Sequence, residues 1–92
     1  MDPQGFEQYS QDARQRGYDE VLVREWQPGQ ATGEHTHPFD ARVMVVRGEV
    51  TLQVGGQARR YGPGELFELV RDTPHTEQYG PQGATFWTAR RH

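Results

Sequence analysis

Apolar and polar residues alternate over several short stretches of the sequence. Turns rich in glycine and proline separate these stretches. The clearest stretch is EVTLQV, residues 49–54, whose three apolar side chains share one face because successive strand residues point to opposite sides. Gly55 and Gly56 follow it, and glycine accepts the positive φ angles of a two-residue hairpin turn. The pattern predicts an all-β antiparallel sandwich or barrel and excludes a parallel βαβ fold.

The remaining apolar stretches predict further strands and one helix. The predicted strands cover residues 20–26, 42–46, 57–61, 66–70, 75–79 and 84–91. Residues 5–17 instead place Phe6, Tyr9 and Ala13 at helical spacing, with Gly17 as the C-terminal stop. We therefore expect residues 1–18 to form a short helical extension and residues 19–92 to form one β-barrel domain.

Length, charge and cysteine content narrow the functions that this chain can have. Its 92 residues suffice for a single domain, and its net charge of -3 with scattered arginines predicts no nucleic-acid partner. The absence of cysteine excludes thiolate ligands, so a transition metal must be held by imidazole and carboxylate. No apolar run is long enough for a membrane span and no signal peptide is recognisable, so we expect a cytoplasmic protein without a membrane partner.

Two histidines stand one residue apart in the segment GEHTHPFDARVMVVRG, residues 33–48. In an extended chain His35 and His37 project to the same face, at the separation that two ligands of one metal ion need. The pair alone fits equally well with two polar residues on the rim of a small β-domain. A metal site therefore needs a third ligand from elsewhere in the chain.

His75 is the candidate for that third ligand. It opens a predicted strand directly after a proline-containing turn, and its neighbours on the same face are Glu77 and Tyr79. The remaining histidine, His92, is the last residue of the sequence and is expected to be frayed.

Two separate motifs resemble those of the cupin superfamily, and together they span residues 20–90. The residues of the first motif are Gly29, His35, His37 and Gly48, and those of the second are Pro63, Gly64, Glu65, Pro74 and His75. The chain is thus similar to a small single-domain cupin. This resemblance implies an antiparallel jelly-roll β-barrel in which His35, His37 and His75 point inward to one divalent metal.

The sequence also departs from the family pattern. Ala41 and Arg42 occupy the two positions where the family glutamate ligand is found, and Tyr79 stands in place of the usual asparagine. Asp40 lies one residue short of the glutamate position, whereas Glu77 shares the face of His75. Asp40 and Glu77 are therefore both candidates for a fourth ligand or a proton carrier, with ordinary surface charges as the alternative.

The expected function is that of a cupin that binds one divalent transition metal, Zn, Mn, Fe or Ni, and a small oxygen-rich metabolite. Phe39, Ala41 and Tyr79 are expected to line the ligand pocket. If the protein is an enzyme, a metal-dependent isomerase or a dioxygenase-like reaction is expected. The alternative is a non-catalytic binding or sensing module, with or without metal. Exposed sheet edges favour a homodimer.

Overall fold

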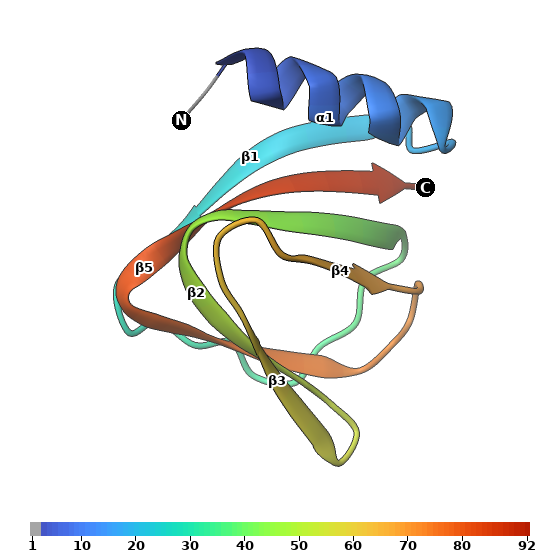
Figure 1. Cartoon of the computed structure of the whole chain (residues 1–92). Coiled ribbons are helices and arrows are strands. Elements are labelled where there is room, and N and C mark those ends of the chain that lie inside the picture. The colour runs from blue at the N-terminus through green and yellow to red at the C-terminus, as the bar shows by residue number, and fades with distance from the viewer. Residues whose placement is uncertain (1–2) are drawn as a thin grey trace.

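Two long antiparallel strands cross the whole fold in the computed structural model, which describes residues 3–92 (Figure 1). They are β2 (Asp40–Val54) and β5 (His75–Arg91). The sequence predicted two separate strands in each of these segments, and the structure corrects this. The β2–β5 register shifts between Val45 and Arg47 and again between Gly48 and Val50, so the paired strands bend there and continue.

The other elements are shorter and flank these two strands. They are α1 (Pro3–Gln15), β1 (Glu20–Trp26), β3 (Gln57–Tyr61) and β4 (Leu66–Leu69). The predicted hairpin at Gly55 and Gly56 is confirmed, because Val54 pairs with Gln57 across it. β4 ends one residue earlier than predicted, and Val70 beyond it is 71% exposed.

The bends divide the sheet into two facing layers. One layer contains β1, the C-terminal half of β5, the N-terminal half of β2, and β4. The other contains the N-terminal half of β5, the C-terminal half of β2, and β3. Isolated bridges from Ala31 and His35 add the segment after β1 to the second layer. Backbone hydrogen bonds do not close the sheet, but the arrangement is the expected antiparallel jelly roll.

Glycine is required at the corner where these strands bend. Gly48 has a φ of +75°, and a Cβ at this position would collide with the carbonyl oxygen of Gly83. Gly83 also has a positive φ, and its own Cβ would collide with the carbonyl oxygen of Trp26. The backbones of β1, β2 and β5 therefore approach one another more closely here than any side chain allows.

The main hydrophobic core fills the space between the two layers. It consists of Ala41, Val43, Val45, Val50, Leu52, Tyr61, Phe67, Leu69, Tyr79, Ala84 and Phe86, with Trp26 and Phe39 packed against it. Aromatic rings supply much of the volume, and the rings of Trp26 and Tyr79 are stacked at 4.6 Å. This core forms the floor on which the candidate site is built.

A second, smaller core lies on the outer face of the first layer, where α1 covers β1 and β5 (Figure 1). Phe6, Tyr9 and Ala13 face this core as their spacing predicted, and the ring of Trp87 lies between the helix and the sheet. The strand at residues 42–46 is therefore covered on both sides. Residues 1–2 of the predicted helical extension lie outside the described residues, and the domain boundary at residue 18 stays a prediction.

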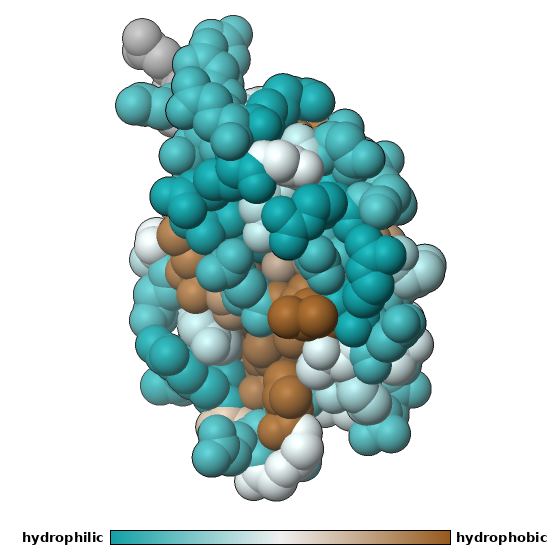
Figure 2. Space-filling view, turned by 90° about the vertical axis from the view of Figure 1, so that its right-hand side faces the viewer, coloured by the Kyte–Doolittle hydropathy of each residue, from teal (hydrophilic) through white to brown (hydrophobic). Residues whose placement is uncertain are grey.

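Polar residues cover most of the molecular surface. Figure 2 shows hydrophilic residues over the upper part of one face and a strip of hydrophobic residues below its centre. The large hydrophobic side chains with the greatest exposure are Val23, Val54, Leu66 and Val70. Within residues 3–92, no helix has the length and apolar character needed to cross a membrane.

Candidate metal centre

Three histidines from two distant segments lie together at one end of the space between the layers. His35 and His37 belong to the segment that connects β1 to β2, and His75 is the first residue of β5. The backbones of His35 and His75 exchange two hydrogen bonds, of 3.0 and 3.1 Å. This bridge brings the third imidazole next to the pair that the His-Thr-His spacing had already placed on one face.

The three rings are close enough to share one ion. Their centroids are separated by 4.3 Å for His35 and His75, 4.8 Å for His35 and His37, and 5.0 Å for His37 and His75. One ring nitrogen from each histidine lies within 4.8 Å of the other two. Nitrogens that bind one metal at about 2.0–2.1 Å lie closer together than this, so the rings would rotate towards one another to bind a common ion.

Backbone carbonyls orient two of these rings. The Nδ1 atom of His35 lies 2.8 Å from the carbonyl oxygen of Gly33, and the Nδ1 atom of His75 lies 2.8 Å from that of Thr73. A carbonyl oxygen can only accept a hydrogen bond, so each Nδ1 donates its hydrogen and each Nε2 of a neutral ring keeps its lone pair. Metal-bound histidines are held in this way, with the second nitrogen bonded to a carbonyl or carboxylate.

The Nε2 atom of His75 lacks a hydrogen-bond partner among the described residues, although it is fully buried. The whole side chain of His75 is only 1% exposed. A buried polar atom without a partner is costly, and most such atoms in folded proteins have one. A metal ion at the centre of the cluster would supply the missing partner, so the residues present fit this group.

His37 is the third member of the cluster, and it is partly buried. Its ring stacks on Phe39 at 4.8 Å. Desolvation by burial, and then the nearby rings of His75 and His35, lower the pKa of His37 to about 4. A histidine of this kind is neutral at physiological pH, which is the form that binds metals.

Glu77 is the carboxylate that lies beside the histidines. One of its oxygens is 3.8 Å from Nε2 of His75 and 4.0 Å from Nε2 of His35. The residue is 7% exposed, and burial is the main cause that raises the pKa of its carboxyl group. The carbonyl oxygen of Glu77 accepts a hydrogen bond from the backbone N–H of Thr32, and the N–H of Glu77 donates one to the Thr32 hydroxyl, which fixes its position on β5. The alternation predicted from the sequence thus holds for this strand, since His75 and Glu77 share one face.

His35 and His37 border a cavity of about 70 Å³ between the layers, whereas His75 is not among its lining residues. Its walls are formed by Arg24, Trp26, His35, His37, Phe39, Ala41, Val43, Phe67, Leu69, Glu77, Phe86, Thr88 and Arg90. Phe39 and Ala41 are among these residues, as expected for the pocket. Tyr79 is not, because its buried ring lies behind Trp26.

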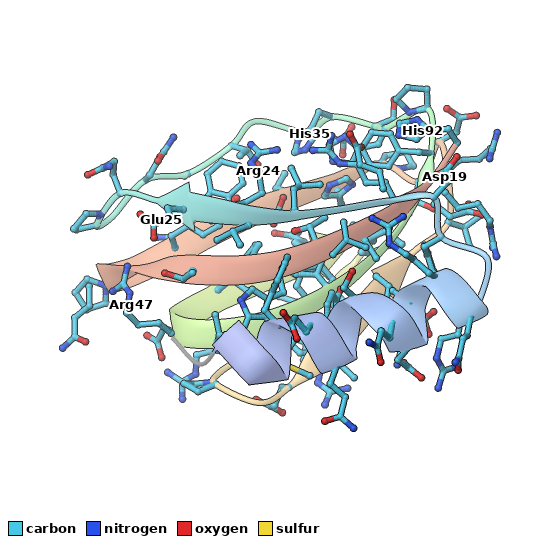
Figure 3. The ribbon with its side chains drawn as sticks, turned by 90° about the horizontal axis from the view of Figure 1, so that it is seen from above. Asp19, Arg24, Glu25, His35, Arg47 and His92 are labelled. Carbon is cyan, nitrogen blue, oxygen red and sulfur yellow. The ribbon has the colours of Figure 1, made fainter. Side chains whose placement is uncertain are left out.

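Two arginines also line this cavity, and neither was predicted as a site residue from the sequence. Arg24 and Trp26 are two residues apart and share one face of β1, and Arg90 lies on β5. In Figure 3, Arg24 lies on the side of β1 that faces His35, away from α1. The spacing of Arg24 and Trp26 showed that they share a face. It did not show which face points inward, because this strand carries apolar residues on both sides.

Asp40 and His92 lie near this end of the barrel but outside the histidine cluster. The carboxylate of Asp40 accepts a hydrogen bond of 2.8 Å from the backbone N–H of Arg71 and two from the guanidinium of Arg91. His92 is not frayed as expected, because its Nε2 atom is 3.1 Å from a carboxylate oxygen of Glu20. Its ring also lies 5.3 Å from that of Phe39.

Solved structures with similar folds support this architecture. A protein of unknown function from Rhizobium leguminosarum bv. viciae 3841 is 21% identical, with a TM-score of 0.74 over 77% of this chain and 67% of its own. KdgF from Halomonas sp. is 22% identical, with a TM-score of 0.66 over 78% of this chain and 67% of its own. The DMSP lyase DddQ from Ruegeria pomeroyi DSS-3 is 22% identical, with a TM-score of 0.71 over 78% of this chain but only 37% of its own.

Identities this low establish the fold and not the activity. No curated protein sequence matches the chain significantly. The family model of the cupin domain, however, matches residues 22–78, which is more than half of the chain and includes all three clustered histidines. On this match and on the jelly-roll topology, the chain belongs to the cupin family.

Proposed function

We propose that this protein binds one divalent transition-metal ion through His35, His37 and His75 and presents the ion to a small oxygen-rich ligand. The observation that carries the proposal is the buried Nε2 atom of His75, which lacks a partner and faces two other imidazoles. Three imidazoles leave coordination positions free for water or a ligand. Zn, Mn, Fe and Ni all remain candidates, because imidazole and carboxylate ligands accept several first-row ions.

Glu77 is proposed as the fourth ligand or as a proton carrier for bound ligands. Ala41 stands at the family glutamate position, so this chain has no carboxylate there. Glu77 lies on β5 with His75, and one of its oxygens is within 4.0 Å of the Nε2 atoms of His35 and His75. Asp40 is a weaker candidate, because both of its oxygens already accept hydrogen bonds from Arg71 and Arg91.

Metal content is the direct test of the site. Protein made without an affinity tag is stripped with a chelator, dialysed separately against each of the four ions, and analysed by mass spectrometry for bound metal. We expect about one ion per chain, and we expect His75→Ala to lose it. His92→Ala is the matched control, because this histidine is close to the site but outside the cluster, and it is expected to keep the ion.

Two results would contradict the metal site. The first is a folded wild-type protein that retains none of the four ions. The second is a His75→Ala variant that binds metal as the wild type does. If His75→Ala does not fold, because its ring is buried in the core, then His37→Ala tests the same point, since His37 is only partly buried.

Turnover separates an enzyme from a binding or sensing module. A similar fold serves a DMSP lyase among the similar structures, but a shared fold does not carry an activity over, so turnover has to be measured. The metal-loaded protein is incubated with chelating organic acids and sugars under air and under nitrogen. Product formation only in air, with oxygen uptake, indicates a dioxygenase-like reaction, and isomerised product in both indicates an isomerase. Saturable binding without product indicates the sensing alternative.

A further inference from the structure

Arg24 is a cation that lines the candidate metal pocket and forms no close ion pair within the described part of the chain. It takes part in none of the ion pairs found among residues 3–92, and it is only half exposed. Its guanidinium carbon lies 4.6 Å from the centre of the Trp26 ring, and this cation–π contact holds the group against the pocket wall. A half-buried guanidinium with free N–H groups is suited to bind an anion that enters from solution.

The second arginine of the pocket is already engaged. Arg90 lies over the ring of Phe39 at 4.7 Å and makes a 3.4 Å ion pair with Glu20, although its Nε atom is buried without a partner. Glu77 is the acid nearest the histidines, but it does not reach ion-pair distance of Arg24. Arg24 is thus the pocket cation that remains available to a ligand.

The charge of the occupied site also calls for an anion. A divalent ion, the carboxylate of Glu77 and the unpaired Arg24 together leave two positive charges in a pocket whose floor is apolar. Buried charge is unfavourable unless an opposite charge compensates it. The pocket measures about 70 Å³, so only a ligand of a few heavy atoms can enter it completely.

We propose that Arg24 binds the carboxylate of a short organic acid whose adjacent hydroxyl or keto oxygen reaches the ion held by the histidines. This assignment rests on the metal site proposed above and specifies its ligand class. The guanidinium donates two parallel N–H bonds to the two carboxylate oxygens, and its contact with the Trp26 ring holds it at the pocket wall. A neutral diol or amide of the same size cannot use this interaction.

Glycolate and glycolamide test the proposal, because they share the hydroxyl group and the number of heavy atoms and differ in charge. Each is titrated into cobalt-loaded protein, and the visible absorption of the cobalt ion reports the binding. We expect the wild type to bind glycolate about tenfold or more tightly than glycolamide, as expected for a charge-assisted hydrogen bond. In Arg24→Gln the preference should fall several-fold, with cobalt stoichiometry unchanged, and the part that remains comes from the attraction of the cobalt ion itself for the carboxylate.

Arg59→Gln is the matched control. Arg59 also lies over the aromatic ring two residues further along its strand, at 4.7 Å from Tyr61, but on β3 and outside the pocket. This variant should keep the wild-type preference for glycolate. Arg24→Lys keeps the charge and loses the paired donors, so it should give an intermediate preference and replaces Arg24→Gln if that variant does not fold.

The outcomes separate failure of the arginine site from failure of the metal site. Equal binding of glycolate and glycolamide by the cobalt-loaded wild type, or unchanged preference in Arg24→Gln, overturns the role of Arg24 and leaves the metal site intact. If the wild type binds no cobalt, the metal site fails. Arg24 is then tested alone by adding glycolate to the metal-free protein and following the nitrogen-15 NMR shifts. Identical shifts in wild type and Arg24→Gln then overturn the proposal.

Discussion

At the scale of single residues, Asp40 connects the start of β2 to the turn after β4 and to the end of β5. Its carboxylate accepts hydrogen bonds from the backbone of Arg71 and from the side chain of Arg91. These bonds, the backbone bond first, lower the pKa of Asp40 below its ordinary value of 3.8. A charged Asp40 therefore stabilises the folded state at neutral pH.

We expect Asp40→Asn to lower the melting temperature at pH 7. The folded-state pKa is depressed, so the contribution is complete above the unfolded-state value near 4 and is lost as the pH falls through the folded-state value. The difference between variant and wild type should therefore shrink towards pH 2. Thermal unfolding followed by circular dichroism between pH 2 and 7 measures it, and a difference independent of pH would contradict this account.

At the same scale, Glu77 and Asp40 show where sequence reasoning reached its limit. Both were candidates for the carboxylate beside the histidines, because each lies within three residues of one of them in the sequence. Strand alternation placed Glu77 on the face of His75, and the structure has this arrangement. The orientation of Asp40 depended on the path of the segment after His37, which no local pattern determines.

At the scale of elements, the corner formed by β1, β2 and β5 depends on Gly48. We expect Gly48→Ala to destabilise the fold by about 2–5 kcal/mol, because it adds backbone strain at positive φ to a collision with the Gly83 backbone. Gly55→Ala is the matched comparison, since its φ is also positive, at +59°, but its Cβ would meet no atom within 4 Å. Urea unfolding should show that Gly55→Ala lowers the free energy of unfolding by about 1 kcal/mol. Equal losses in the two variants would exclude the collision as a cause.

The packing of α1 against the sheet stabilises the fold at a place away from the candidate metal site. Tyr9 is 8% exposed, packs on Trp87, and donates a 2.7 Å hydrogen bond to the carbonyl oxygen of Arg42. We expect Tyr9→Ala to lower the free energy of unfolding by about 3–5 kcal/mol. Metal stoichiometry measured well below the melting temperature should not change, because the helix covers the outer face of the sheet and the histidines lie inside. Loss of metal from the folded variant would contradict this separation.

At the scale of the whole molecule, the proposed metal should stabilise the fold, since it bridges two segments that are distant in the sequence. At a free metal concentration one hundred times the dissociation constant, the gain is about 2.7 kcal/mol. For a domain of this size that corresponds to a rise in melting temperature of roughly 10–20 °C. Scanning calorimetry with and without the ion measures it. The same rise in His75→Ala would show that the ion binds elsewhere.

Assembly is the second property of the whole molecule. The homodimer expected from the open sheet edges stays a prediction, and the strip of hydrophobic residues in Figure 2 is a surface that a second copy could cover. Sedimentation velocity at several protein concentrations should give the mass of two chains. A single species with the mass of one chain at all concentrations would contradict it.

Local pattern alone determined much of this protein. Period-two alternation gave the strands, Gly55 and Gly56 marked the hairpin, and the spacing of Phe6, Tyr9 and Ala13 marked the helix that packs on the sheet. These features depend on neighbours within a few residues, for which side-chain direction follows directly from backbone geometry.

Tertiary structure alone decided the features that depend on pairing between distant segments. The strands predicted on either side of Gly48 form one bent strand because β5 pairs with both of them across the bend. Arg24 and Trp26 face the pocket because the helix covers the other side of β1, a choice that a strand apolar on both faces leaves open. The histidines meet because the backbones of His35 and His75 pair across forty residues, a contact that no local periodicity encodes.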